Sequence, residues 1–129
     1  SSFNLSDKYS ITFSNDGNIV AVGDPTSRRG DNNRDKPGSV TIYEYNDGTW
    51  SQLGGDLDGE SGDYAGRSVS ITSDGLIVAV GAWRHDSDKG TVRVYQRDLT
   101  NTTVAPIGWS QLGGDLDGSS GDRRYCSIN

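Results

Sequence analysis

The decapeptide WSQLGGDLDG occurs twice in this chain, at residues 50–59 and again at 109–118. Two further segments recur in the same order, because 10–23 resembles 68–81 and 38–43 resembles 90–95. Self-similarity with a period of tens of residues is the signature of a repeat architecture, in which each copy of the sequence builds one copy of a structural unit. This repetition constrains the fold more than any other feature of the chain.

The repeat divides the chain into three parts. Residues 1–59 and 60–118 are predicted to form two full units, and residues 119–129 are predicted to supply the first strand of a third. The two full copies differ in length at two places only. Length differences are tolerated where the backbone runs over the surface, so we expect loops at those two places and strands in the matched segments.

Each unit is predicted to contain four antiparallel strands. Apolar residues alternate with polar ones in most of the matched segments, and no apolar stripe at helical spacing persists beyond one turn. The sequence therefore predicts an all-β fold. In the second unit the expected elements are a strand around Val69 and Ile71, a tight turn at 73–75, a strand at 77–80, a strand around Val92 and Val94, and a strand that starts at Trp109.

The segment LIVAV at 76–80 is apolar at every position, whereas the strands beside it alternate. A strand without alternation needs apolar cover on both faces of its sheet. Four-stranded sheets stacked between similar sheets, as in the blades of a β-propeller, provide that cover. We therefore predict tandem propeller-type blades. The propeller is incomplete, because closing a ring takes about four to eight blades.

Charge and composition exclude several classes of partner. Twelve Lys and Arg against eighteen Asp and Glu give a net charge of −6, which argues against nucleic acid and against an anionic membrane surface. No stretch approaches the ~20 apolar residues of a membrane span. The chain starts at Ser1 without the features of a signal peptide, which indicates a processed product or a piece of a larger protein.

Two N-glycosylation sequons favour an extracellular or cell-surface location. They lie at Asn4-Leu5-Ser6 and at Asn101-Thr102-Thr103, so Asn4 and Asn101 are the candidate glycosylation sites. Cys126 is the only cysteine, so it cannot form a disulfide within the chain. It either pairs with another chain or remains a free thiol.

The segment GDYAGRSVSITSDGLIVAVGAW, from Gly62 to Trp83, resembles the FG-GAP type of β-propeller repeat, which is found in integrin α-chain heads and in extracellular proteins of microbes and algae. Ala65-Gly66 stands where that family has Phe-Gly, and 81–83 stands where it has Gly-Ala-Pro. The resemblance implies an extracellular propeller module. The copies at the two ends depart from the Phe-Gly position, with Asp7-Lys8 in the first and Arg124-Tyr125 in the tail.

The calcium loop of integrin-like repeats is not reproduced in the hairpins of this chain. A weaker candidate for Ca²⁺ is the group Asp56, Asp58 and Asp63, because carboxylates between glycines supply the oxygen ligands that this cation prefers. The alternative is that these Asp-Gly pairs form turns, with carboxylates accepting backbone N–H groups. Turn chemistry is favoured, and no cofactor is predicted.

Other motifs have a functional and a structural interpretation. Arg29-Gly30-Asp31 is an adhesion tripeptide in a charged loop, where chance occurrence is favoured. His85 lacks a second histidine or a nucleophile motif, so a solvated loop residue is favoured over catalysis. Trp83 has no counterpart in the first unit and is the better candidate for contact with a glycan. Trp50 and Trp109 recur at one position, which favours packing between blades.

Two blades and one strand leave an apolar face open at each end. Either the polypeptide continues, or identical chains stack head to tail into a filament or a closed ring, with the strand at Ser127-Ile128 added to the next chain. We therefore expect a non-enzymatic, self-assembling extracellular structural module. The alternatives are a carbohydrate-binding or protein-binding propeller module, with Trp83 and the nearby loops at its rim, and a fragment of a longer surface propeller protein.

Overall fold

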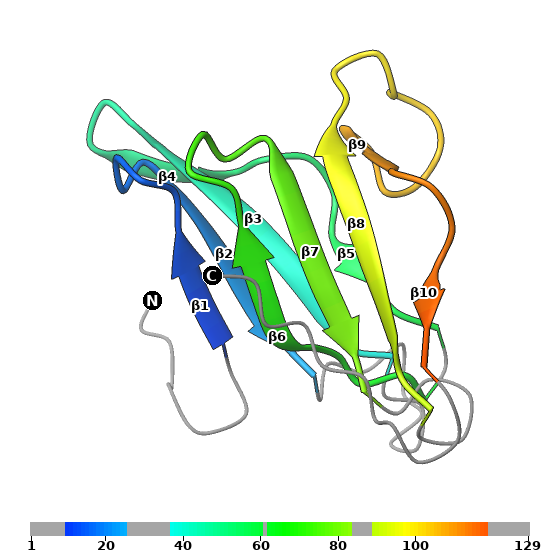
Figure 1. Ribbon diagram of the computed structural model, residues 1–129. Coiled ribbons are helices and arrows are strands. Elements are labelled where there is room, and N and C mark those ends of the chain that lie inside the picture. The colour runs from blue at the N-terminus through cyan, green and yellow to red at the C-terminus, as the bar shows by residue number, and fades with distance from the viewer. Residues whose placement is uncertain (1–9, 26–36, 61, 84–88, 119–129) are drawn as a thin grey trace, which may run out of the picture.

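The computed structural model describes residues 10–25, 37–60, 62–83 and 89–118. These residues form two antiparallel β-sheets that lie face to face, and no helix occurs among them (Figure 1). The all-β prediction is confirmed. The first sheet contains β1 (Ser10–Phe13), β2 (Ile19–Asp24), β3 (Ser39–Asn46), β4 (Thr49–Gln52) and β5 (Leu57–Asp58). The second contains β6 (Ala65–Ile71), β7 (Ile77–Ala82), β8 (Thr91–Arg97), β9 (Trp109–Gln111) and β10 (Leu116–Asp117).

Both sheets have the same topology, which is that of a four-stranded blade with a broken last strand. Along the first sheet the order is β1-β2-β3, and both β4 and β5 pair with β3. Along the second sheet the order is β6-β7-β8, and both β9 and β10 pair with β8. The repeated decapeptide supplies this broken strand in both sheets. The two sheets therefore form propeller-type blades, and the described strands do not close into a ring.

The first hairpin of each sheet is closed by the same arrangement of an acidic turn. Asp16 accepts hydrogen bonds from the Ser14 hydroxyl at 2.8 Å and from the Asn18 backbone N–H at 3.0 Å. Thr72 and Leu76 provide the same two donors to Asp74, at 2.7 Å and 3.0 Å. The glycine that follows each Asp has a φ of +77°, a conformation that side chains rarely adopt. The turn predicted at 73–75 is therefore confirmed, and the first sheet has the same turn at Asp16.

The main hydrophobic core lies between the two sheets, because each strand turns alternate residues toward the other sheet. Strands β1, β2 and β3 all contact β6 across this interface. A second, smaller cluster around Ala79 and Val92 lies on the other face of the second sheet, so β7 carries buried apolar side chains on both faces. The buried residues of the main core are Ala21, Val40, Ile42, Leu57, Ala65, Val78, Val80, Ala82, Tyr95 and Trp109.

The predicted division into residues 1–59, 60–118 and 119–129 remains a prediction. The strands of the first sheet span 10–58 and those of the second span 65–117. The predicted first strand of a third unit lies outside the described residues.

Candidate functional site

The interface between the two sheets is anchored by the tryptophan of the second decapeptide. Trp109 is fully buried, and its indole Nε1 donates a hydrogen bond to the backbone carbonyl of Leu53 at 3.1 Å. Leu53 lies in the break of the last strand of the first sheet, between β4 and β5. A second bond joins the same regions, from the Gly55 N–H to the carbonyl of Ile107 at 2.8 Å. The strand break of one sheet therefore receives the tryptophan of the next.

The break accepts the indole because it contains glycine. A Cβ added at Gly54 would lie 2.6 Å from the Ile107 carbonyl oxygen and 2.7 Å from Trp109 Nε1, closer than side-chain carbons approach. Gly54 also has a φ of +76°. The two glycines of the decapeptide therefore serve both to break the strand and to make room for the neighbouring sheet.

A second contact between the sheets lies at the hairpin tips. The Asn15 N–H donates to the Ser73 carbonyl at 2.9 Å, which joins the two acidic turns side by side. The side chain of Ile19 packs against Gly75, where an added Cβ would lie 2.5 Å from Ile19 Cδ1. The tips are therefore held in a defined register by one backbone bond and one close apolar contact.

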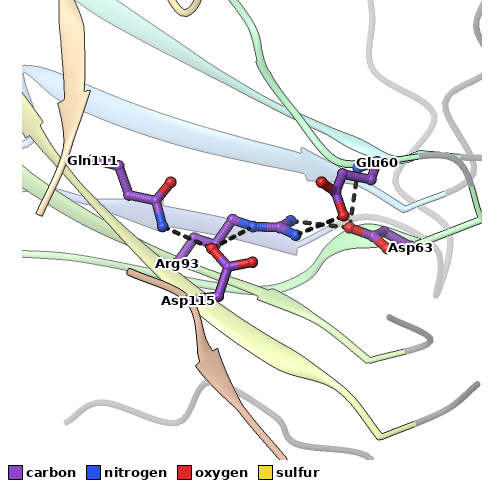
Figure 2. A network of polar contacts seen from close by, with 5 residues as sticks. All are labelled: Glu60, Asp63, Arg93, Gln111 and Asp115. Atoms are coloured by element: carbon purple, nitrogen blue, oxygen red, sulfur yellow. Dashed lines mark hydrogen bonds and ion pairs between the residues drawn. The ribbon is translucent and has the colours of Figure 1, made fainter. Parts of the chain in front are cut away.

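The third contact is a buried ion network around Arg93 in β8 (Figure 2). Its Nη1 lies 2.9 Å from Asp63 Oδ2, its Nε lies 3.1 Å from Asp115 Oδ1, and its Nη2 lies 3.5 Å from Glu60 Oε1. Gln111 Nε2 donates to the same Asp115 oxygen at 2.8 Å. Glu60 and Asp63 belong to the segment that connects the sheets, so the network ties this connection to the second sheet.

The network keeps its arginine charged. Burial alone would lower the pKa of Arg93, but hydrogen bonds and charge attraction from Asp115 and Asp63 outweigh it and raise that pKa. Burial raises the pKa of the Tyr95 hydroxyl, which lies on the same face of β8. The interface therefore contains a fixed positive charge that is matched by fixed carboxylates.

The outward face of the first sheet carries the same residue types that are buried in the interface. In the register of the first sheet Trp50 lies opposite Tyr45, and in the second sheet Trp109 lies opposite Arg97. The two tryptophans therefore hold equivalent positions in the last strand of each sheet. Trp50 is 45% exposed, whereas Trp109 is 0% exposed. The rings of Tyr45 and Trp50 contact each other, with centroids 5.1 Å apart. Ile11 and Phe13 are exposed on this face as well.

The outward face of the second sheet carries a strand break without an occupant among the described residues. Leu116 is 56% exposed, whereas its counterpart Leu57 is 1% exposed. Leu112 is exposed too, and a Cβ added at Gly113 would meet nothing within 4 Å. Identical decapeptides thus have different environments, because among the described strands only those of the second sheet lie against the first copy on this side.

Comparison with known families is consistent with this repeated architecture. Residues 56–95, from β5 through β8, match the family model of the FG-GAP repeat. This segment is an FG-GAP repeat. FG-GAP repeats are typical of non-enzymatic propeller modules of extracellular proteins. No curated protein matches the chain. Among the described residues no helix is long and apolar enough to cross a membrane.

The three acidic residues considered as a metal site, Asp56, Asp58 and Asp63, each interact with a different residue. Asp56 accepts a hydrogen bond from Gln52 Nε2 at 2.7 Å, and Asp58 pairs in register with Ser39. Asp63 is buried against Arg93 and accepts the Glu60 N–H at 3.0 Å. Within the described segments no three His, Cys, Asp or Glu side chains form a group that could hold a metal ion. Calcium at these residues, the weaker alternative in the sequence analysis, stays a hypothesis.

Trp83, predicted as a contact for a glycan, directly follows β7. Two side chains contact its ring. The guanidinium of Arg67 lies 5.3 Å from the ring centroid, and the ring of Tyr64 meets it edge to face at 6.0 Å. Cation–π and edge contacts of this kind fix the orientation of an indole. The ring is thus engaged within its own sheet, and its contact with a glycan stays a prediction.

Asn101, a predicted glycosylation site, organises the loop between β8 and β9. Its Nδ2 donates to the carbonyls of Val104, Pro106 and Trp109, at 2.8 Å, 3.0 Å and 2.7 Å. Its Oδ1 accepts the Val104 N–H at 3.1 Å. An N-linked glycan would be attached to this same nitrogen and would replace one of its two hydrogens, so Nδ2 could not keep all of these hydrogen bonds. Glycosylation here stays a prediction.

The remaining predicted site residues lie outside the described residues, and their roles stay predictions. They are Asn4, Arg29, Gly30, Asp31, His85 and Cys126.

Sequence reasoning missed Arg93, which is central to the interface. The alternating apolar residues Val92 and Val94 marked the strand, but the structure turns Arg93 and Tyr95 toward the first sheet. A charged residue between Val92 and Val94 was the available signal. Its partners Asp63 and Asp115 are distant in sequence, so the pairing was not visible there.

Proposed function

We propose that this chain is a structural module of extracellular assemblies, in which identical copies stack head to tail through their open blade faces. The observation that carries the proposal is the contrast between the two decapeptides. Trp109 and Leu57 are buried in the interface, whereas Trp50 and Leu116 occupy the equivalent positions on the two outward faces and are exposed. The tryptophan and leucine positions of the two outward faces therefore correspond to those of the two faces that already meet.

Burial of such side chains is a strong driving force. Aromatic residues such as tryptophan dominate interface energetics, and apolar area contributes about 25 cal/mol per Å² when it leaves water. Exposed apolar patches on folded domains mark interaction sites. A head-to-tail contact uses two different faces, so each added copy presents a new open face, and assembly continues into a filament or closes into a ring.

The proposed extracellular location is supported by the FG-GAP repeat and by the sequons at Asn4 and Asn101. Expression through a eukaryotic secretory pathway followed by mass spectrometry tests this location. Glycan mass on a secreted, folded chain is the expected result. Retention of the chain in the cell without any glycan would contradict an extracellular role.

Sedimentation velocity and light scattering across a wide range of concentrations test the assembly itself. The expected result is a mass that rises with concentration in steps of one chain. Negative-stain images should show filaments or rings at the highest concentration. A particle with the mass of one chain at every concentration would overturn self-assembly.

A further inference from the structure

We propose that the docking point between copies is the strand break at 112–114 of one chain, which receives Trp50 of the next. This inference rests on the proposed self-assembly and specifies its register. In the contact, the indole Nε1 of Trp50 donates to the backbone carbonyl of Leu112. This is the bond that Trp109 makes to Leu53 within the chain.

The receiving break is already in the conformation that binds an indole. The Leu53 N–H donates to the Ile42 carbonyl at 2.7 Å, and the Leu112 N–H donates to the Val94 carbonyl at 2.7 Å. The following glycines have similar φ values, +76° at Gly54 and +70° at Gly113. Among the described residues one break holds an indole and the other does not, yet the two breaks share this hydrogen bond and this glycine conformation. Docking therefore requires no backbone rearrangement, which lowers the cost of association.

A second point of contact agrees with the same register. Within the chain, Ile19 packs against the turn glycine Gly75. The equivalent pair between copies is Ile77 of one chain and Gly17 of the next. A Cβ added at Gly17 would meet nothing within 4 Å, so the space that an isoleucine needs is open there. The Ser73 N–H would then face the Asn15 carbonyl, which repeats the backbone bond between the hairpin tips.

One part of the internal interface is not reproduced between copies. Arg93 pairs with Val80 in the β-ladder, and the equivalent partner of Val22 in the first sheet is Thr41. The open face of the first sheet therefore lacks the arginine that joins the two sheets inside the chain. The contact between copies is mainly apolar, and the chain carries a net charge of −6. Added salt should therefore leave association unchanged or strengthen it by screening repulsion between copies.

Two variants block one face each. Trp50→Glu removes the inserted indole. Gly113→Asn keeps the positive φ, which asparagine tolerates, and adds a side chain where the docked indole would lie. Gly62→Asn is the matched control, because Gly62 also has a positive φ, with open space around its Cβ, and lies in the connection between the sheets. Circular dichroism and thermal unfolding should first be measured, to check that all three variants fold.

Sedimentation of each variant and of a mixture tests the register. Under conditions in which the unaltered chain assembles, each blocking variant alone should associate about 30-fold more weakly or worse. The Gly62→Asn control should assemble normally. An equimolar mixture of the two blocking variants should form a dimer and nothing larger, since one partner retains an intact tryptophan and the other an intact strand break.

The possible failures are distinguishable. An unaltered chain that stays monomeric overturns the proposed function. Assembly of both blocking variants at the level of the unaltered chain overturns the docking register and leaves self-assembly in place. Blocking variants that stay monomeric even when mixed overturn the head-to-tail arrangement, because both residues would then lie on one self-complementary surface.

Discussion

Asp63 and Arg93 form an ion pair at 2.9 Å, and both side chains are more than nine-tenths buried at the junction of the two sheets. A buried pair of this kind adds little net stability compared with apolar packing, but removal of one partner leaves a buried charge without compensation. The pair joins the connecting segment to β8, so it fixes how the second sheet follows the first.

Removal of the arginine should therefore be costly. We expect Arg93→Met to lower the free energy of unfolding by about 3–5 kcal/mol, measured by urea denaturation, because Asp63 would remain charged and buried. The double variant Arg93→Met with Asp63→Asn should recover part of this loss, since no unpaired charge remains at that position. Glu60→Gln is the control. The Glu60 side chain is 72% exposed, so its loss should cost less than about 1 kcal/mol. Equal losses for Glu60→Gln and Arg93→Met would contradict the assigned role.

The two tryptophans of the repeated decapeptide should respond differently to truncation. Trp109→Ala should cost about 3–5 kcal/mol of unfolding free energy, because it empties the centre of the interface. Trp50→Ala should cost about 1 kcal/mol or less in dilute solution, because Trp50 is already 45% exposed and its ring contact is with Tyr45 at the surface. Chemical denaturation at low protein concentration measures both values. Similar losses at the two positions would show that Trp50 is also buried in the isolated chain.

The glycines after the repeated leucines provide a matched pair. Gly54→Ala and Gly113→Ala both place a side chain at positive φ, so the backbone cost is shared. Only the Cβ at position 54 meets Trp109 and Ile107, so Gly54→Ala should be the more destabilising by about 1–3 kcal/mol. The difference between the two midpoints in urea isolates the packing contribution. A difference near zero would mean that the sheets separate easily at this point.

Acid should destabilise the two hairpin tips and the loop after β8. Hydrogen bonds lower the pKa of Asp16, Asp74 and Asp98 below the ordinary value of 3.8. The main donors are the Asn18 N–H to Asp16, the Thr72 hydroxyl to Asp74 and the Thr100 hydroxyl to Asp98. These carboxylates bind protons less readily in the folded chain than in the unfolded chain, so their contribution is present above pH 3.8 and is lost as the pH falls through the lowered pKa values.

Unfolding free energies measured from neutral pH downward check this dependence. The variant with asparagine at all three positions should lose less stability in acid than the unaltered chain, because the amide oxygen still accepts these bonds and does not titrate. Parallel losses in acid for the two proteins would assign the acid sensitivity to other carboxylates.

The loop before β9 should depend on the Asn101 amide. Asn101→Ala should cost about 1–3 kcal/mol in the chain without a glycan, because the carbonyls of Val104, Pro106 and Trp109 lose the hydrogen bonds from the Asn101 amide. Thr103→Ala removes the sequon but leaves the amide, so its stability should be unchanged. Thermal unfolding of the three proteins makes the comparison. Loss of stability in Thr103→Ala as large as that in Asn101→Ala would contradict the role of the amide.

Much of the fold could be read from local patterns. Alternation and turn residues act over a few neighbours, so the hairpin turns at Asp16 and Asp74 and the apolar strand β7 were predictable. The candidate site was less accessible. The packing role of Trp109 followed from its repeated position, but the burial of Arg93 did not, because the carboxylates that stabilise it come from distant parts of the chain.

The sequence by itself determined that two equivalent blades form and where each strand breaks, because hydrogen-bonded ladders, glycine turns and side-chain alternation depend on local order. Only the tertiary structure decided which copy of the decapeptide is buried and which is exposed. Ten identical residues cannot encode that difference. Burial depends on what lies across the face of the sheet, and Trp109 has a neighbouring sheet there, whereas Trp50 lies on an open face.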